Sequence, residues 1–313
     1  MRSCASLIAG LIAAGTLLSA CSNGAFVEAT QAGAPRIGHV YLMRGLAGEV
    51  FSLGLHSLAQ KLNERGIPAT VHSLPAAITL PGEIAQRYKS DPSSAPIVLL
   101  GHSSGGDAII SIAEKLRAAN VPVALAFGFD PTPLAGRVPD NVELFVNLFQ
   151  KTNPIGGGEV RAAQGFKGRL INVDLREHTE IIHITLDKSE AIHRVVIDQV
   201  AAVVAQARGS LPAAEPRAAS RPRGQAVAAP QPVRPLQMRY VIPREAPVEI
   251  WDHAVRVAAG PGQTWEAIAA EQSVPTWLLL QVNRVSEGVA PQPGAQVLIP
   301  RQSARPGGLA AAR

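Results

Sequence analysis

The stretch Pro96-Ile97-Val98-Leu99-Leu100-Gly101-His102-Ser103-Ser104-Gly105 decides the fold, because it joins an apolar run to a helical run through a glycine-flanked serine. Residues 107–117 continue it with the apolar spacing of an amphipathic helix. Glycines on both sides of Ser103 let the backbone turn sharply without a Cβ clash, and the turn lifts the serine hydroxyl off the sheet. Ser103 is therefore a candidate nucleophile, and the alternative is a plain glycine-rich turn with a capping serine.

Short β runs and helical stretches alternate on both sides of this turn, from residue 37 to about residue 207. The expected strands are 37–43, 69–74, 96–101, 121–129, 142–148 and 169–174, and the expected helices are 50–64, 82–89, 105–118 and 188–207. This alternation predicts an α/β domain with a mostly parallel sheet. Right-handed crossovers would bring the C-terminal ends of the strands, and any site, to one edge of that sheet.

A serine hydroxyl needs a base to take its proton, and the base needs an acid that fixes its tautomer. His183 is the preferred base, because it lies between the last strand and the last helix of this domain, at the edge expected for Ser103. His178 is a competitor on the same loop, whereas His193 falls within a helix and is expected to face solvent. His102 belongs to the turn itself, and its side chain is expected to point away from Ser103.

Asp130 is the preferred acid, because it ends the strand that follows the nucleophile helix and so reaches the same edge. The alternative for this residue is an aspartate that caps the turn at Pro131. Asn153 and Asp174 follow later strands and are weaker rivals.

The oxyanion of an acyl-transfer reaction needs backbone donors. The backbone N–H of Ser104 is one candidate, because it begins a helix whose dipole favours negative charge. The glycine-rich turn after the first strand should supply the second, with Leu46 N–H preferred and Gly45 N–H as the fallback. Arg44 in the same turn either orients an anionic substrate or is simply solvated.

The order Ser103, Asp130, His183 along the chain and the glycine-flanked serine turn resemble the α/β-hydrolase superfamily over about 170 residues. An acid after the strand next to the nucleophile is similar to thioesterase domains and some lipase domains. The resemblance implies hydrolysis of ester or thioester bonds. The segment after Asp130 is too short for a substantial lid, so the expected site is shallow or open and its substrate class stays undefined.

The N-terminus has the features of an export signal. A short positive start is followed by an apolar run over residues 7–18 that is too short to span a membrane. The sequence Leu18-Ser19-Ala20-Cys21 resembles the lipobox of bacterial lipoproteins, and an ordinary cleaved signal peptide is the alternative. The resemblance implies lipidation of Cys21, which would be the single cysteine of the mature chain, and Ser22 after it implies the outer membrane.

The composition changes after the α/β domain. From Arg208 to about Met238, Pro, Ala, Arg and Gln dominate without a periodic apolar face, which predicts an extended linker. Much of the formal net charge of +5 comes from arginines in this segment. No basic face with interleaved aromatic residues is present, so nucleic acid is not an expected partner, and no metal-ligand cluster or phosphate loop predicts a cofactor.

A second compact unit follows, with a strand near residue 255, a helix capped by Thr264, a helix from about residue 275 and a final strand ended by Pro300. This β-α-α-β pattern resembles a LysM domain, a family that binds N-acetylglucosamine glycans, mainly peptidoglycan. The resemblance implies glycan contacts from Gly262, Gln263, Thr264 and the region after Asn283. Gln263 stands where the family usually has Asp.

The sequence thus predicts a signal peptide (1–20), a tether (21–35), an α/β-hydrolase-like domain (36–207), a linker (208–238), a LysM-like unit (239–301) and a disordered tail (302–313). The expected function is an envelope serine hydrolase, lipid-anchored at the periplasmic face of the outer membrane and held to peptidoglycan by its second unit. The alternative is a non-catalytic lipoprotein that bridges the membrane and the cell wall.

Overall fold

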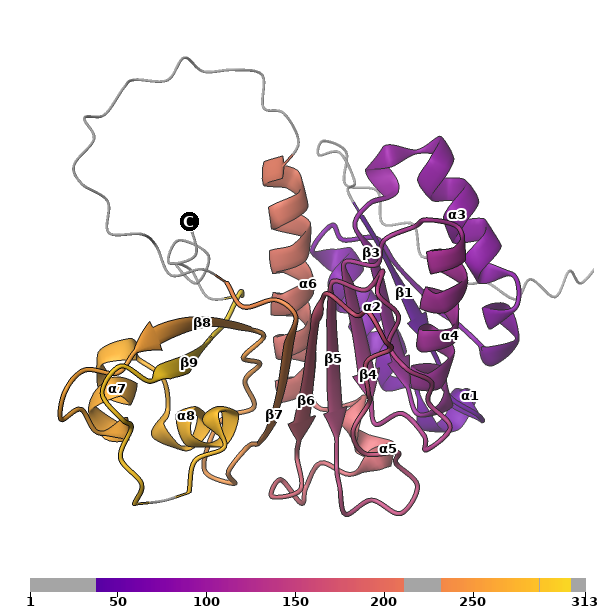
Figure 1. The fold of residues 1–313 in the computed structure, drawn as a ribbon. Coiled ribbons are helices and arrows are strands. Elements are labelled where there is room, and N and C mark those ends of the chain that lie inside the picture. The colour runs from indigo at the N-terminus through magenta and orange to yellow at the C-terminus, as the bar shows by residue number, and fades with distance from the viewer. Residues whose placement is uncertain (1–37, 211–231, 287, 305–313) are drawn as a thin grey trace, which may run out of the picture. The chain divides into compact units, whose positions relative to one another are not determined.

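The computed structural model describes residues 38–210, 232–286 and 288–304 (Figure 1). The predicted signal peptide, the tether with Cys21, most of the linker and nearly all of the tail lie outside these residues. Within the described part of the chain, no helix has both the length and the apolar character needed to cross a bilayer.

The central feature is a seven-stranded sheet in the order β2-β1-β3-β4-β5-β6-β7, in which every neighbouring pair is parallel. Its strands are β1 (His39–Met43), β2 (Ala69–His72), β3 (Ile97–His102), β4 (Leu125–Phe129), β5 (Leu144–Phe149), β6 (Arg169–Asp174) and β7 (Leu236–Val241). The inner strands are buried throughout, as expected for a parallel sheet covered on both faces. The predicted α/β class with a parallel sheet is confirmed.

Helices cover both faces of this sheet. The longer ones are α2 (Gly54–Glu64), α3 (Leu80–Ser90), α4 (Ser104–Ala118) and α6 (Glu190–Ser210), and α1 (Gly48–Phe51) and α5 (His183–Leu186) are single turns. Helices α2 and α6 pack with one set of alternating strand residues, and α3 and α4 pack with the other set. The strand arrows in Figure 1 point toward α1 and α5, which therefore lie at the C-terminal edge of the sheet.

The predicted single helix over residues 50–64 is divided into α1 and α2. Gly54 begins α2 against the main chain of Asp187, where an added Cβ would lie 2.0 Å from the Asp187 carbonyl oxygen. Its N–H also donates to the Asp187 carboxylate at 2.9 Å. The break between the helices places Ser52 in the interior, at 1% exposure.

Strand β7 changes the predicted domain boundaries. Helix α6 continues to Ser210, and β7 begins at Leu236, inside the segment assigned to the linker. Arg169 of β6 pairs in register with Leu236, and Asp174 pairs with Val241. Residues from beyond the linker therefore complete the large sheet.

The rest of the C-terminal part has the predicted β-α-α-β order. Strands β8 (His253–Ala258) and β9 (Gln296–Arg301) form a two-stranded antiparallel sheet, and α7 (Trp265–Gln272) and α8 (Thr276–Asn283) lie between them in the chain. Thr264 caps α7 by accepting the N–H of Ala267 at 3.2 Å. The Gln281 side chain of α8 bonds both backbone groups of Val241, at 2.8 and 3.0 Å, and so covers the free edge of β7.

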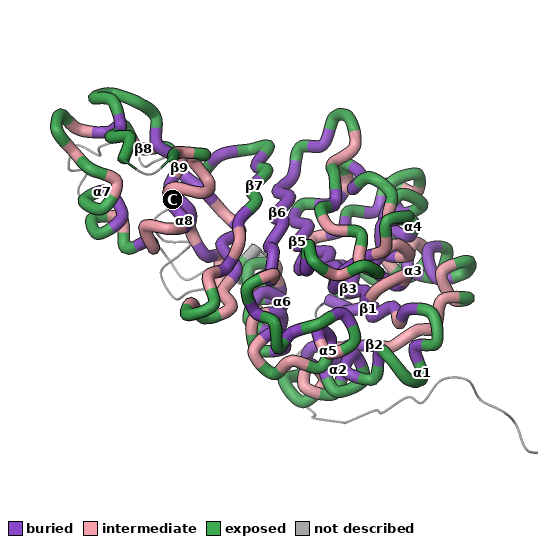
Figure 2. Tube along the Cα trace, turned by 90° about the horizontal axis from the view of Figure 1, so that it is seen from below, coloured by how far each residue is buried: buried purple, intermediate pink, exposed green. Residues whose placement is uncertain are grey.

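Burial follows this arrangement along the chain. Figure 2 shows buried residues along the strands and exposed residues along the connecting loops. One apolar cluster includes residues of the large sheet, Tyr240 of β7, Trp251 and Leu278 of α8. A buried ion pair also joins Arg169 of β6 to Asp252, at 3.3 Å. The second unit thus shares a core with the first, instead of being separated from it at residue 238.

Candidate active site

Ser103 lies on the sharp turn between β3 and α4, with the unusual backbone angles φ 57° and ψ −128°. The two flanking glycines are required by close backbone contacts. A Cβ on Gly101 would lie 2.2 Å from the Gly105 carbonyl oxygen, and a Cβ on Gly105 would lie 2.1 Å from that of Met43. The sequence therefore permits the strained turn that presents the serine hydroxyl at the sheet edge.

The structure brings the three predicted catalytic side chains together from distant parts of the chain. His183 Nε2 lies 3.0 Å from Ser103 Oγ, and His183 Nδ1 lies 2.9 Å from Asp130 Oδ2. Both distances are within hydrogen-bond range. The geometry allows the imidazole to accept the serine proton on one nitrogen while the carboxylate holds the proton on the other.

Burial and hydrogen bonds fix the acid. Asp130 is fully buried at the end of β4, and its Oδ2 accepts a second, short hydrogen bond from the Asn153 amide. Asn153, a rival for the acid on sequence grounds, is instead a partner of the acid. Helix α4 also holds the loop after Asp130. The Asp107 carboxylate accepts the backbone N–H of Thr132 at 2.9 Å and the Thr132 hydroxyl at 2.5 Å.

The alternative candidates for the base and for the acid bond other groups. His178 bonds Glu180 and the carbonyl of Pro243, and Asp174 pairs with Arg176. The prediction that His193 faces solvent is wrong, because the residue is 2% exposed. Its ring lies between α2 and α6, with Nε2 2.6 Å from the Asp187 carbonyl and Nδ1 3.0 Å from Lys61 Nζ.

The predicted oxyanion donors lie beside the nucleophile. Leu46 N–H donates to the Ser104 hydroxyl at 2.8 Å, so the turn after β1 and the start of α4 are in direct contact. The fallback donor, Gly45 N–H, points into the interior and donates to Ser52 Oγ at 3.2 Å. Arg44 pairs with Glu49 at 2.8 Å. Leu46 N–H therefore remains the candidate oxyanion donor from this turn. To act as one, it must exchange the Ser104 hydroxyl for a substrate oxygen as its acceptor.

Exposed apolar side chains gather around this edge of the sheet. The described residues include ten exposed large apolar side chains, and nine of them are in the loops and short helices that follow the C-terminal ends of parallel strands. These nine, which we call the apolar rim, are Leu46, Val50, Phe51, Leu53, Ile78, Leu134, Ile155, Ile182 and Ile184. Ile182 and Ile184 flank the base, and Leu46 carries the candidate oxyanion donor.

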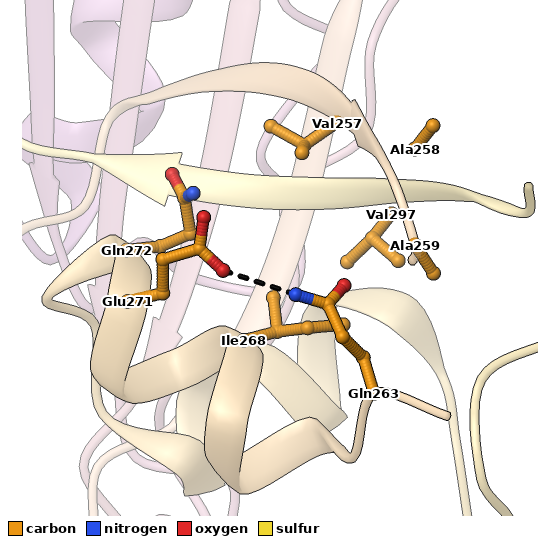
Figure 3. A pocket seen from close by; sticks show the side chains of 8 residues that line it. All are labelled: Val257, Ala258, Ala259, Gln263, Ile268, Glu271, Gln272 and Val297. Atoms are coloured by element: carbon orange, nitrogen blue, oxygen red, sulfur yellow. Dashed lines mark hydrogen bonds between the residues drawn. The ribbon is translucent and has the colours of Figure 1, made fainter. Parts of the chain in front are cut away.

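Of the residues expected to bind glycan, Gln263, Thr264 and Asn283 use their side chains in hydrogen bonds within the second unit. Gln263 accepts the Gly260 N–H at 2.7 Å and donates to Glu271 at 3.0 Å, beside a cavity of about 50 Å³ (Figure 3). The Asn283 side chain bonds the backbone of Leu298, and Gly262 has φ +69°. The cavity is far smaller than the roughly 300 Å³ of a small ligand site.

A hydrogen bond joins the start of α7 to the loop before β9. The indole N–H of Trp265, just after the first turn, donates to the carbonyl of Val289 at 2.6 Å. Val289 is itself 58% exposed on the loop before β9. Both polar atoms of the Gln263 amide are therefore bonded within the second unit, whereas the Val289 side chain is open to solvent.

No protein-family model matches the sequence, and no curated protein is significantly similar to it. Several solved structures are similar over about half of the chain. Lipase B of Aspergillus fumigatus is 12% identical with a TM-score of 0.38, covering 53% of this chain and 52% of the lipase. The NocB thioesterase domain is 16% identical with a TM-score of 0.35, covering 53% of this chain and 94% of that domain.

Est1E from Butyrivibrio proteoclasticus is 15% identical with a TM-score of 0.34, covering 54% of this chain and 90% of that protein. The parallel sheet, the helices on both faces and the Ser103 turn between β3 and α4 are those of the α/β-hydrolase fold.

Proposed function

We propose that this protein is a serine hydrolase that cleaves esters or thioesters with an apolar acyl group. The observation that carries the proposal is the hydrogen-bonded series Ser103, His183, Asp130, with distances of 3.0 and 2.9 Å. A relay of this kind activates a serine hydroxyl that would otherwise be a weak nucleophile.

In the proposed reaction, Ser103 Oγ attacks the acyl carbonyl while His183 Nε2 takes the serine proton. The carbonyl becomes an oxyanion that Ser104 N–H and Leu46 N–H stabilise. His183 then returns the proton to the leaving alcohol or thiol, which leaves an acyl group on Ser103. A water molecule, deprotonated by His183, attacks this acyl-enzyme and releases the carboxylic acid and the free serine.

The apolar rim supports an acyl substrate over a strongly polar one. Leu46, in the turn of the candidate oxyanion donor, and Ile182 and Ile184, on either side of His183 in the chain, are 79%, 44% and 40% exposed. Covering these side chains with an acyl chain removes apolar surface from water, which favours binding. A bare sugar O-acetyl group would leave most of this rim uncovered.

The test is ester hydrolysis by the full chain on a series of water-soluble esters of increasing acyl length. We expect turnover that rises with acyl length, is lost in Ser103→Ala and persists in Ser111→Ala. Ser111 is a matched control because it is an exposed serine on the same helix, α4. A folded wild-type chain without turnover on any ester or thioester would reject the hydrolase proposal. The alternative would then be a non-catalytic lipoprotein that bridges the membrane and the cell wall.

We further propose that the chain is lipidated at Cys21, faces the periplasm from the outer membrane and binds peptidoglycan through a LysM-like unit. The lipobox-like Leu18-Ser19-Ala20-Cys21 supports the anchor, and the β-α-α-β order supports the glycan-binding unit. Metabolic labelling with a palmitate analogue tests the anchor, since label should appear on the wild type and not on Cys21→Ala.

Co-sedimentation of the full chain with purified peptidoglycan tests the second part. Binding should be competed by N-acetylglucosamine oligomers and weakened in Val289→Asp. Val50→Asp is the control, because Val50 is as exposed as Val289 (60% against 58%) but lies on α1. Equal sedimentation of both variants and the wild type would contradict a glycan site between the two loops joined by Trp265.

A further inference from the structure

The histidine next to the nucleophile is buried between two loops that serve the proposed reaction. His102 is 1% exposed and does not contact Ser103 through its ring nitrogens. Its Nδ1 lies 2.8 Å from Ser52 Oγ, and its Nε2 lies 2.8 Å from the backbone carbonyl of His183. Ser52 in turn accepts the backbone N–H of Gly45 at 3.2 Å.

The chemistry of these groups allows one arrangement of protons. A carbonyl oxygen can only accept, so the His102 proton is on Nε2 and donates to the His183 carbonyl. Nδ1 of the neutral ring is then an acceptor, and the Ser52 hydroxyl donates to it. The Ser52 oxygen is left to accept the Gly45 N–H, and every member of the series is satisfied.

This series joins two parts of the site that are far apart in the chain. Gly45 precedes Leu46, the candidate oxyanion donor, and His183 is the base. Gly45 also lies close to the nucleophile, since a Cβ there would be 3.0 Å from the Ser103 Cβ. A change in the position of His102 would therefore move the base and the oxyanion turn together.

We propose that His102 is a positioning residue, which sets the distance between the His183 imidazole and the oxyanion donors through its bonds to the His183 carbonyl and Ser52. The inference rests on the proposed hydrolase function. It assigns a role to the second residue of the Gly-His-Ser-Ser-Gly turn, which the proposed relay does not use.

The role requires that His102 stays uncharged. Burial lowers the pKa of His102 to about 4, so the ring is neutral in the range where a histidine base works. Its ring centroid lies 5.0 Å from that of His183, which becomes positively charged during the reaction. A second positive charge at this distance would oppose that step. A neutral ring can hold the base without this penalty.

Two substitutions of His102 separate its two hydrogen bonds. In His102→Gln the amide nitrogen reaches the former position of Nε2 and keeps the donor to the His183 carbonyl. In His102→Asn the shorter side chain still offers an acceptor to the Ser52 hydroxyl, but it no longer donates a hydrogen bond to the His183 carbonyl. His39→Asn is the control, because His39 is also buried (6% exposed) but bonds Thr70 near the start of β1.

Steady-state kinetics on a soluble ester, with active sites counted by titration, give the first readout. We expect His102→Asn to lower kcat about tenfold with KM unchanged, since one buried hydrogen bond to the base is lost. His102→Gln keeps the bond to the His183 carbonyl and loses the one to Ser52, so it should lower kcat less than His102→Asn does, and His39→Asn should leave kcat unchanged. A role in folding alone would lower the melting temperature of both Asn variants without changing kcat per active site.

The second readout does not need turnover. In the Ser103→Ala background, the low-field proton resonance of His183 Nδ1–H, bonded to Asp130, reports the position of the base. The resonance should shift in His102→Asn and stay in place in His102→Gln. Wild-type kcat together with an unmoved resonance in His102→Asn would overturn the inference. An inactive wild type whose resonance shifts as expected would instead reject the hydrolase function and keep the positioning role.

Discussion

Replacing Tyr240 by Ala tests whether strand β7 belongs to the large sheet. The Tyr240 side chain is 1% exposed, and its hydroxyl accepts the backbone N–H of Trp251 at 2.9 Å and donates to the Glu249 carbonyl at 3.4 Å. Truncating a buried aromatic residue costs about 3–5 kcal/mol. Loss of the hydrogen bond from Trp251 N–H to the Tyr240 hydroxyl adds about 1–3 kcal/mol. The sum is a large part of the roughly 5–15 kcal/mol that stabilises a typical domain.

Urea unfolding followed by circular dichroism measures the loss, with Tyr240→Phe as the matched control. The control keeps the ring and loses only the hydroxyl, so it should cost about 1–3 kcal/mol. Hydrogen exchange of the peptide that contains β3 (Ile97–His102) shows which sheet is affected. We expect its exchange to accelerate in Tyr240→Ala. Unchanged exchange at β3, with destabilisation confined to residues after 240, would refute the shared core and restore the boundary predicted at residue 238.

Four further substitutions address the site and the stability of the fold around it. Asp130→Asn should lower kcat by about 10⁴-fold with the fold intact, because the base loses the carboxylate that fixes its tautomer; steady-state kinetics with a soluble ester measure this. Gly105→Ala should lower the melting temperature sharply and abolish turnover, because its Cβ would lie 2.1 Å from the Met43 carbonyl oxygen. Gly82→Ala, in α3 with nothing within 4 Å of the added Cβ, should stabilise the protein by about 1 kcal/mol. Burial raises the pKa of Asp187 from 3.8 to about 6, so the folded state favours its protonated form and stability should fall as pH rises from about 4 to about 6. In Asp187→Asn this pH dependence, worth up to about 3 kcal/mol, should disappear from urea titrations at pH 4 and pH 8.

The sequence was sufficient to predict the site because its signals are local. The strand predicted over 169–174 is a short run built around Leu170, Ile171 and Val173, and the structure assigns β6 to the same residues. Ser103, Asp130 and His183 each follow such a run or lie on the loop after it. Parallel topology then brings the ends of the runs to one edge, so placement along the chain was enough to select them.

Features that depend on a distant partner could not be predicted. Residues 236–241 alternate between buried and exposed positions, but their neighbour in the sheet is β6, more than 60 positions earlier in the chain. The proline-rich composition before them favoured a linker. Ser52 and His102 likewise have no local pattern that indicates a bond between them, since their contact exists only after α1 and β3 are packed together.

The proposed hydrolase function depends most directly on the chemical identity of the nucleophile. Incubating the full chain with a fluorophosphonate and mapping the product by mass spectrometry tests it. We expect one phosphonyl group per chain, attached to Ser103, with no label on Ser103→Ala and much slower labelling of His183→Ala. A folded wild-type chain that stays unlabelled, or that carries the label on another residue, would contradict the account.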